Sequence, residues 1–119
     1  MEEESRVRNA MLLDFYGELL TEKQRECFDL HYNEDLSLSE IAEQSGISRQ
    51  GVWDNIRRAE AAMTEIENKT GLLSRFRELS RGLSSLAGKL ESLSSLTEGE
   101  ANDITAAALA EVRALMARR

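Results

Sequence analysis

The fold of this chain is decided by residues 37–58, which read SLSEIAEQSGISRQGVWDNIRR. Ser37 can cap a first short helix, and Glu40 follows three residues later, where it can reach back to complete a capping box. Gly46 falls where the turn requires a positive φ angle, which glycine adopts without steric cost. Ser48 can then cap a second helix. Two capped helices joined by a glycine turn predict a helix-turn-helix.

The second helix of this motif has an apolar inner face and a polar outer face. Apolar residues recur on the inner face at helical spacing, namely Val52, Ile56, Ala59, Met63 and Ile66. The outer face carries the residues that can contact a partner, namely Arg49, Gln50, Trp53, Asp54, Arg57 and Arg58. This pattern is fairly specific for the motif and much less specific for the ligand that the motif contacts.

The composition indicates an all-α protein with one domain and an extension. The chain has 119 residues, 41% hydrophobic and 31% charged, and it contains no proline. A first helix is expected over residues 5–20, a second begins after Thr21, and Gly71 ends the long motif helix. We expect no membrane span, because no segment approaches about 18 consecutive apolar residues. The acidic start of the chain lacks the pattern of a signal peptide, so a cytoplasmic location is expected.

The sequence offers little for catalysis or metal binding. Cys27 and His31 are the only residues of their types, and we interpret Cys27 as a buried thiol in a reducing compartment. Their spacing of four residues lets them meet on a helix, although one cysteine and one histidine cannot complete a typical zinc site. No glycine-rich phosphate loop is present. We therefore predict a protein that is not an enzyme and has no cofactor or metal.

The pattern changes at Leu72, where apolar residues begin to alternate in spacings of four and three. This heptad seam consists of Leu72, Phe76, Leu79, Leu83, Leu86, Leu90 and Leu93. Such a narrow seam packs either on the chain's own motif domain or on a second copy. Its regularity favours the second copy, so we predict a homodimer through residues 72–96.

The remaining residues complete the expected domain organisation. Residues 97–100 are a linker, and 102–116 form a last helix with Ile104, Ala108, Val112 and Leu115 on one side. The expected domains are therefore a helix-turn-helix domain over 1–71 and a helical dimerisation extension over 72–119.

The net charge of −7 is distributed unevenly along the chain. Residues 1–71 hold 16 acidic and 8 basic residues, a net charge of −8, whereas residues 72–119 hold 6 and 7, a net charge of +1. Proteins that bind duplex DNA neutralise phosphates with a basic face. Three arginines on an acidic body make a weak phosphate footprint, which lowers the expectation of general duplex binding.

Two features of the outer face each have two interpretations. Trp53 either packs against the first motif helix or the extension, or serves as a contact anchor, because tryptophan is enriched at binding hot spots. Arg49, Arg57 and Arg58 are either solvated charges paired with nearby carboxylates, such as Asp54, or contacts to phosphate or to an acidic protein face.

The stretch from about Leu12 to Leu73 resembles the YlxM-like proteins of bacteria. The resemblance rests on DFYG at 14–17, LTEKQRE at 20–26, SLSEIAE at 37–43 and SRQGVWDNIRR at 48–58. Members of this family have a fold similar to the fourth region of sigma factors. The resemblance implies a cytoplasmic, non-enzymatic protein that acts with the signal recognition particle, because genes of the family tend to lie beside those of that pathway.

The same resemblance implies roles for individual residues. The recognition helix would present Ser48, Arg49, Gln50, Trp53, Asp54 and Arg57. The preceding helix would begin with Lys23, Gln24 and Arg25, where sigma-like domains can meet a backbone phosphate. The implied partner is the RNA or a protein of the particle. The alternatives are a DNA-binding transcriptional regulator that uses helix 49–67 for recognition, and a module that only binds proteins.

Overall fold

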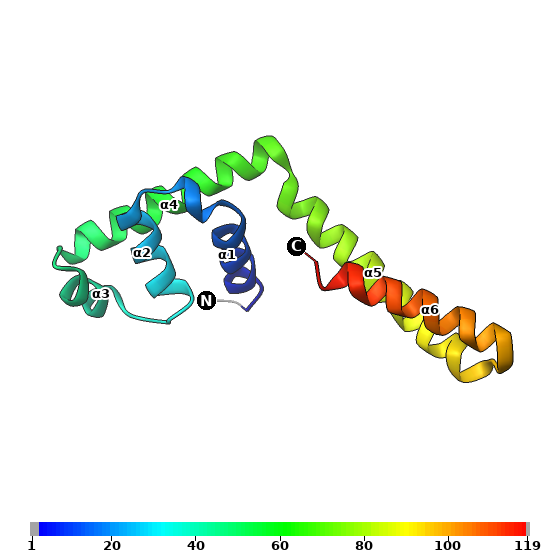
Figure 1. Cartoon of the computed structure of the whole chain (residues 1–119). Helices are drawn as coiled ribbons and strands as arrows, with labels where there is room; N and C mark the ends of the chain where they lie inside the picture. Colours follow the sequence, from blue (N-terminus) through cyan, green and yellow to red (C-terminus); the bar gives the residue numbers. More distant parts are fainter. Residues whose placement is uncertain (1–2, 119) are drawn as a thin grey trace. The chain divides into compact units, whose positions relative to one another are not determined.

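The computed structural model describes residues 3–118, which form helices and connecting turns without a strand (Figure 1). The helices are α1 (Glu3–Tyr16), the short 3-10 helix η1 (Gly17–Leu19), α2 (Glu22–Tyr32), α3 (Leu38–Ser45), α4 (Arg49–Thr70), α5 (Leu72–Leu96) and α6 (Gly99–Met116). The prediction of an all-α fold is confirmed. The chain divides into two compact units, residues 1–73 and 74–119. The functional domains 1–71 and 72–119 stay a prediction, and their residues 1, 2 and 119 lie outside the described part.

The helix ends of the first unit follow the signals in the sequence. Ser37 and Glu40 form the expected capping box, and Thr21 forms a second one with Gln24. Gly46 ends α3 with a φ angle of 71°. These contacts satisfy backbone donors that a helix start leaves unpaired. The caps of Thr21 and Ser37 thus fix where α2 and α3 begin, and Gly46 fixes where α3 ends.

Helix α4 is the centre of the first unit, because α1, α2 and α3 all pack against it (Figure 1). The core consists of fully buried side chains from all four helices, among them Leu12, Cys27, Phe28, Ile41, Val52, Ile56 and Met63. The expected burial of Cys27 is confirmed, and burial raises the pKa of its thiol. This core packs against the inner face of α4, so the outer face of the helix is held in a fixed position.

A buried hydrogen-bond network holds the end of α4. Oε1 of Glu67 accepts a hydrogen bond from the hydroxyl of Tyr16 at 2.6 Å and another from the backbone N–H of Leu73 at 2.9 Å. Gly71, with a φ angle of 64°, ends α4 as expected. The first residues of α5 are therefore tied to α1 and α4 at this point.

Two helix boundaries differ from the prediction. The first helix ends at Tyr16, because Gly17 begins a 3-10 turn and Leu20 is extended before the Thr21 cap. The last helix begins at Gly99, so the linker is reduced to residues 97 and 98. The side-chain amide of Asn102 donates to the carbonyl oxygens of Ser94 and Thr97, at 2.7 and 3.2 Å, which closes this turn.

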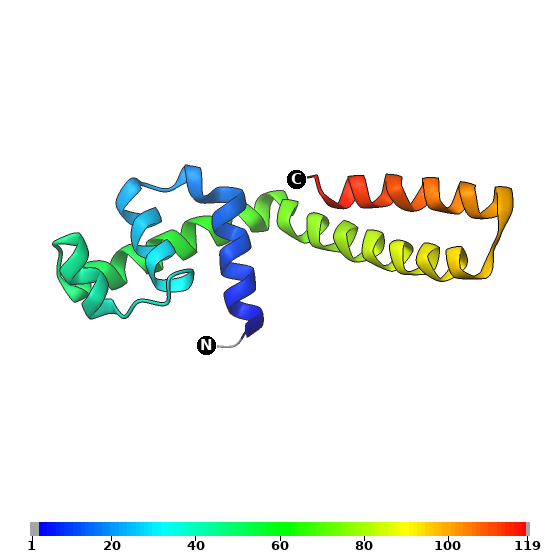
Figure 2. The ribbon, with the colours of Figure 1, turned by 60° about the horizontal axis from the view of Figure 1, so that its bottom comes forward.

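The second unit is an antiparallel hairpin of α5 and α6, which lie side by side in both views (Figure 1 and Figure 2). Its core is formed by Ala87, Leu109 and Val112, with Leu83 and Leu90 packed against them. An ion pair of 2.8 Å between Glu91 and Arg113 also joins the two helices.

This hairpin corrects two details of the sequence analysis. Leu83 and Leu90 pack on the chain's own last helix, which was neither of the two partners considered. The expected apolar stripe of α6 is correct at Val112, which is buried, and wrong at Ile104 and Leu115, which are exposed. Thr105 and Leu109 are buried in their place. The other row of the heptad seam remains exposed and consists of Leu72, Leu79, Leu86 and Leu93.

Candidate partner-binding surface of the helix-turn-helix

The first turns of α4 present an exposed surface next to the start of α3. A hollow of about 260 Å³ is lined by Leu38 of α3 and by Arg49, Gln50 and Trp53 of α4. A second hollow, of about 610 Å³, follows α4 from Trp53 along Arg57, Glu60, Ala61, Thr64, Glu65 and Asn68. Trp53 belongs to both hollows. We call Leu38, Arg49, Gln50, Trp53 and Arg57 the α4 surface.

Trp53 is partly exposed to solvent, and its ring lies against the guanidinium group of Arg57. Its exposed fraction is 38%, so it is not buried against a neighbouring helix. The guanidinium carbon of Arg57 lies 5.8 Å from the centre of the indole ring, within the range of a cation–π interaction. The indole is therefore partly ordered in the free protein and still offers ring area to a partner.

The arginines of this surface carry charge that no nearby carboxylate neutralises. Between residues 3 and 118, no ion pair within 4.0 Å joins Arg49, Arg57 or Arg58 to an acidic side chain. Asp54 instead accepts a hydrogen bond of 3.1 Å from the side-chain amide of Gln50. The predicted pairing of these arginines with nearby carboxylates is thus not formed, and their charge is open to a ligand.

Ser48 contributes to the start of α4. Its side-chain oxygen accepts a hydrogen bond of 2.9 Å from the backbone N–H of Gly51. This cap fixes the first turn, from which Arg49 and Gln50 project. Ser48 therefore positions the surface, whatever further contact its hydroxyl makes.

The two cations predicted on α2 do not join this surface as one cluster. Nζ of Lys23 lies 3.6 Å from Oε2 of Glu26 and donates to the carbonyl oxygen of Ser45 at 3.5 Å. Ser45 in turn donates to Oε1 of Glu26 at 3.1 Å. Arg25 is exposed, and two residues along a helix place it about 200° from Lys23. Lys23 thus holds α2 against the end of α3.

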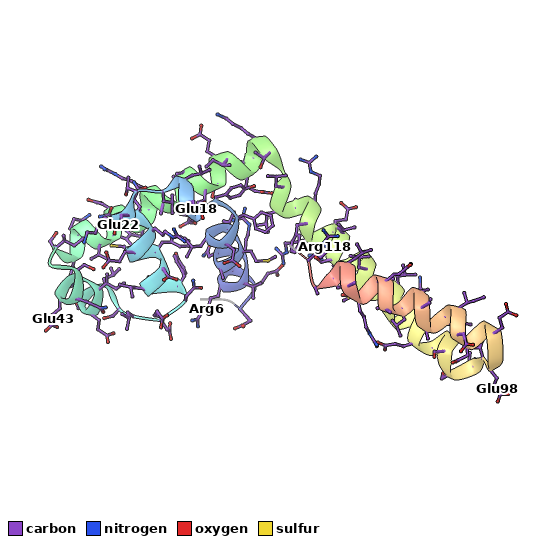
Figure 3. All side chains as sticks on the ribbon, viewed as in Figure 1. Arg6, Glu18, Glu22, Glu43, Glu98 and Arg118 are labelled. Atoms are coloured by element: carbon purple, nitrogen blue, oxygen red, sulfur yellow. The ribbon has the colours of Figure 1, made fainter. Side chains whose placement is uncertain are left out.

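The other helices of the first unit carry many acidic side chains. Figure 3 labels Glu18, Glu22 and Glu43 on η1, α2 and α3 of this unit. Residues 1–73 hold 16 acidic and 8 basic residues, a net charge of −8. The arginines of α4 are therefore a local positive region on a negative body.

Sequence reasoning missed Leu38 and the continuation of the surface along α4. Leu38 directly follows the cap of α3, and nothing in its local sequence indicates that it borders α4. Residues 60, 61, 64 and 68 lie 7, 8, 11 and 15 positions after Trp53, which is helical spacing, so extending the outer stripe would have found them.

The described residues contain no arrangement typical of a metal site or of a cysteine–histidine pair. No group of three or more His, Cys, Asp and Glu side chains among them is placed to hold a metal ion. Nδ1 of His31 lies 2.9 Å from the carbonyl oxygen of Leu36, so His31 stabilises the loop after α2. No helix in residues 3–118 is long and apolar enough to cross a membrane.

Two capped helices, a glycine turn and an exposed outer face define a helix-turn-helix protein. The chain belongs to the UPF0122 family, whose model matches residues 3–103 and is described as "Putative helix-turn-helix protein, YlxM / p13 like". This match extends the resemblance noted in the sequence well into the hairpin.

Curated relatives support this membership. A UPF0122 protein of Clostridium kluyveri is 43% identical over 100 residues, covering 84% of this chain and 90% of the relative. A UPF0122 protein of Bacillus thuringiensis is 48% identical over 95 residues, covering 80% and 83%. One from Acetivibrio thermocellus is 57% identical over 67 residues, covering 56% and 57%.

Proposed function

We propose that this chain is a non-enzymatic accessory protein of the cytoplasm whose α4 surface binds the RNA of the signal recognition particle. The pathway comes from the family resemblance in the sequence, because genes of that family tend to lie beside those of the signal recognition particle. The same resemblance implies a likeness to the fourth region of sigma factors. The observation that carries the ligand class is Trp53, partly exposed beside Arg57. Proteins recognise unpaired RNA bases by stacking them on aromatic rings and on arginine planes.

The charge of the first unit supports unpaired RNA over a long duplex. Duplex binders gain most of their non-specific affinity from many phosphate contacts. The α4 surface has two cations, Arg49 and Arg57, and Arg58 lies about 180° from Arg49 around the same helix. All three belong to a unit with a net charge of −8. Contacts to a long phosphate backbone would also bring phosphates close to the carboxylates of the first unit, which would repel them. A ligand with few phosphates and exposed bases fits this surface better.

The second candidate function is a DNA-binding transcriptional regulator. It is favoured by the position of Arg49, Gln50 and Trp53 at the start of the second helix of the motif, where recognition helices contact bases. In this case Lys23 and Arg25 would approach the backbone of the duplex. A protein of the same particle is the third candidate, and it would use the same surface.

The test is a titration of the full chain that compares RNA with duplex DNA. Trp53 is the only tryptophan, so its fluorescence reports directly on the proposed surface. The titrant is either the RNA of the signal recognition particle or random duplex DNA of equal length, at about 50 and 200 mM salt. We expect quenching by the RNA, with much weaker binding of the duplex.

The salt dependence checks how many phosphates are contacted. Three contacts to a single strand give a slope of about −2 in log affinity against log salt, which is roughly an 18-fold loss over this range. An affinity that hardly changes with salt would contradict phosphate contacts and favour a protein partner. Equal affinity for duplex and RNA would instead favour the DNA-binding function.

Variants locate the binding surface, with anisotropy of labelled RNA as the readout. Trp53→Ala and Arg57→Ala should each weaken binding about tenfold or more, and Trp53→Phe should restore part of the loss. Lys69→Ala is the matched control, because Lys69 pairs with Glu65 roughly 30 Å along α4 from Arg49. If Lys69→Ala weakened binding as much as Arg57→Ala, the α4 surface would not be the site.

We also propose that the chain is a homodimer that forms through α5. Four leucines of the heptad seam, Leu72, Leu79, Leu86 and Leu93, remain exposed after α6 has packed on α5. Large exposed apolar patches on a soluble protein usually mark an interaction site. Sedimentation that gives a monomer at tens of micromolar would contradict this proposal.

A further inference from the structure

One side of the α5–α6 hairpin exposes a continuous set of large apolar side chains. We call it the leucine face and define it by Leu79, Leu86 and Leu93 of α5 with Ile104 and Leu115 of α6. Their exposed fractions are 62%, 45%, 45%, 64% and 52%. Within the described hairpin no third helix covers this area, so its exposure costs free energy in water.

The helical geometry puts both contributions on the same side of the hairpin. On α5, Leu79 and Leu86 lie four residues before Leu83 and Leu90, which pack toward α6. Leu93 lies three residues after Leu90, so all three leucines flank that contact on the same side. On α6, Ile104 lies one residue before the buried Thr105 and flanks the same contact. Because the helices are antiparallel, the leucine flank of α5 and the Ile104 flank of α6 lie on the same side of the hairpin. A groove of about 580 Å³, lined by both Leu79 and Leu115, agrees with this placement.

The charges of the hairpin are separated along its length. Its open end, where α5 begins and α6 ends, carries one carboxylate, Glu78, and four cations, namely Arg75, Arg77, Arg81 and Arg118. Its closed end, around the turn from α5 to α6, carries Glu98, Glu100 and Asp103. Figure 3 labels Arg118 and Glu98 at these opposite ends. A second hairpin laid antiparallel brings opposite charges together, whereas a parallel one brings like charges together, which disfavours that orientation.

The spacing of the leucines is symmetric about Leu86. Leu79 and Leu93 each lie seven residues from Leu86, about 10 Å along the helix. In an antiparallel pair centred on Leu86, each Leu79 meets Leu93 of the second copy, and Arg75 comes near the acidic end. Homodimer interfaces are usually two-fold and self-complementary, which this pattern satisfies.

We infer that a second copy of this chain covers the leucine face in antiparallel orientation, with Leu86 of both copies at the two-fold axis. The assembly is a four-helix bundle in which the α5–α6 hairpin is the repeating unit. The inference rests on the proposed homodimer and adds its face, its orientation and the contribution of Ile104 and Leu115 from α6.

The first experiment tests the face by sedimentation of the full chain. Leu86→Glu should convert the dimer to a monomer, halving the measured mass, because it places a charge at the axis next to its own copy. Ala106→Glu is the control, since Ala106 is exposed and lies about 200° from Ile104 and about 180° from Leu115 around α6. Circular dichroism checks that both variants keep their helices.

The second experiment tests the orientation by thiol crosslinking. The wild type should not crosslink, because its single Cys27 is buried. Leu86→Cys should crosslink with itself. Leu79→Cys and Leu93→Cys should each give little product alone, and an equal mixture of the two should give several-fold more.

The outcomes separate the levels of the proposal. A monomeric wild type overturns both the homodimer and this inference. A wild-type dimer that persists in Leu86→Glu leaves the homodimer standing and overturns the leucine face. Efficient crosslinking of Leu79→Cys and of Leu93→Cys each with itself means a parallel pair, and overturns only the orientation.

Discussion

Replacing Tyr16 with phenylalanine should lower the free energy of unfolding of the first unit by about 1.5–3 kcal/mol. The hydroxyl of Tyr16 donates to Glu67 at 2.6 Å, and the two residues are only 4% and 9% exposed. Hydrogen bonds to a charged group are worth more than neutral ones, and burial prevents water from replacing the lost donor. The ring itself stays, so little packing is lost.

The other contacts of Glu67 set the expected order of the variants. Oε1 of Glu67 also accepts the backbone N–H of Leu73, and the Tyr16 hydroxyl lies 2.8 Å from Oγ1 of Thr70. Glu67→Ala leaves the N–H of Leu73 without this acceptor, so it should cost more than Tyr16→Phe. Glu67→Gln keeps a side-chain carbonyl oxygen and should cost less than Glu67→Ala.

The assay is urea unfolding followed by the fluorescence of Trp53, which lies in the first unit and is the only tryptophan. With a slope of about 1–2 kcal/mol per molar urea, a loss of 2 kcal/mol lowers the midpoint by roughly 1–2 M. Tyr32→Phe is the matched control. The Tyr32 ring packs on Phe28 with centroids 4.5 Å apart, and its hydroxyl makes no side-chain hydrogen bond within residues 3–118. A midpoint shift for Tyr16→Phe no larger than that of Tyr32→Phe would refute the reasoning.

Three further predictions concern caps, pH and glycines. Ser37→Ala should cost about 1 kcal/mol in the same urea assay. Because hydrogen bonds from the backbone N–H and the side chain of Ser37 lower the pKa of Glu40, the part of the stability due to this cap should be lost as the pH falls below about 4.5. Glu40→Gln should remove that pH dependence, whereas Ser37→Ala keeps the backbone N–H and should remove only part of it. Burial raises the pKa of Cys27 above 9.0 and the pKa values of Tyr16 and Tyr32 above 10.0. The stability that these three groups contribute should therefore be constant below about pH 9 and fall as the pH rises further, which urea midpoints at several alkaline pH values would measure. Gly46→Ala should destabilise the first unit by about 1 kcal/mol because the φ angle of Gly46 is 71°. Gly88→Ala should stabilise α5 by up to about 1 kcal/mol, since nothing lies within 4 Å of an added Cβ. Thermal melts of both variants compare them directly.

The parts of the fold that the sequence predicted correctly depend on local hydrogen bonds. The cap of Ser37 and the turn at Gly46 are determined by residues within three or four positions, so spacing alone locates them. The start of the last helix was misplaced because the amide of Asn102 reaches back eight residues to the carbonyl of Ser94. A contact of that range leaves no periodic signal in the sequence.

The pairing of α5 with α6 was missed for a different reason. Both rows of the heptad seam are leucine-rich, so the pattern of α5 does not say which row is buried inside the chain. The choice depends on α6, where Thr105, Leu109 and Val112 make the buried stripe. Thr105 was not counted as apolar, although its hydroxyl is satisfied by the carbonyl of Ala101 at 2.8 Å. A polar residue that satisfies its own hydrogen bond can thus shift the apparent stripe by one position.

The candidate site was predicted as a list of outer residues but not as a surface. Helical periodicity identifies Arg49, Trp53 and Arg57 as outward, because each lies away from the buried positions of α4. It does not report that Leu38 of α3 borders Trp53, since the crossing of two helices determines that contact. It also does not separate Lys23, which contacts Glu26 and Ser45, from cations that are open to a ligand.

The size of the α4 surface limits the affinity that one copy can supply. A dissociation constant of 1 μM corresponds to about 8 kcal/mol, whereas stacking one base on Trp53 contributes about 1–3 kcal/mol. The three arginines add phosphate contacts that weaken with salt and oppose the charge of −8 on their own unit. Binding two sites on one ligand would raise the overall affinity without new contacts, provided that the ligand spans both. A dimer formed through the leucine face would supply the second α4 surface, so Leu86→Glu should weaken RNA binding even though Leu86 belongs to the second unit and is not part of the α4 surface.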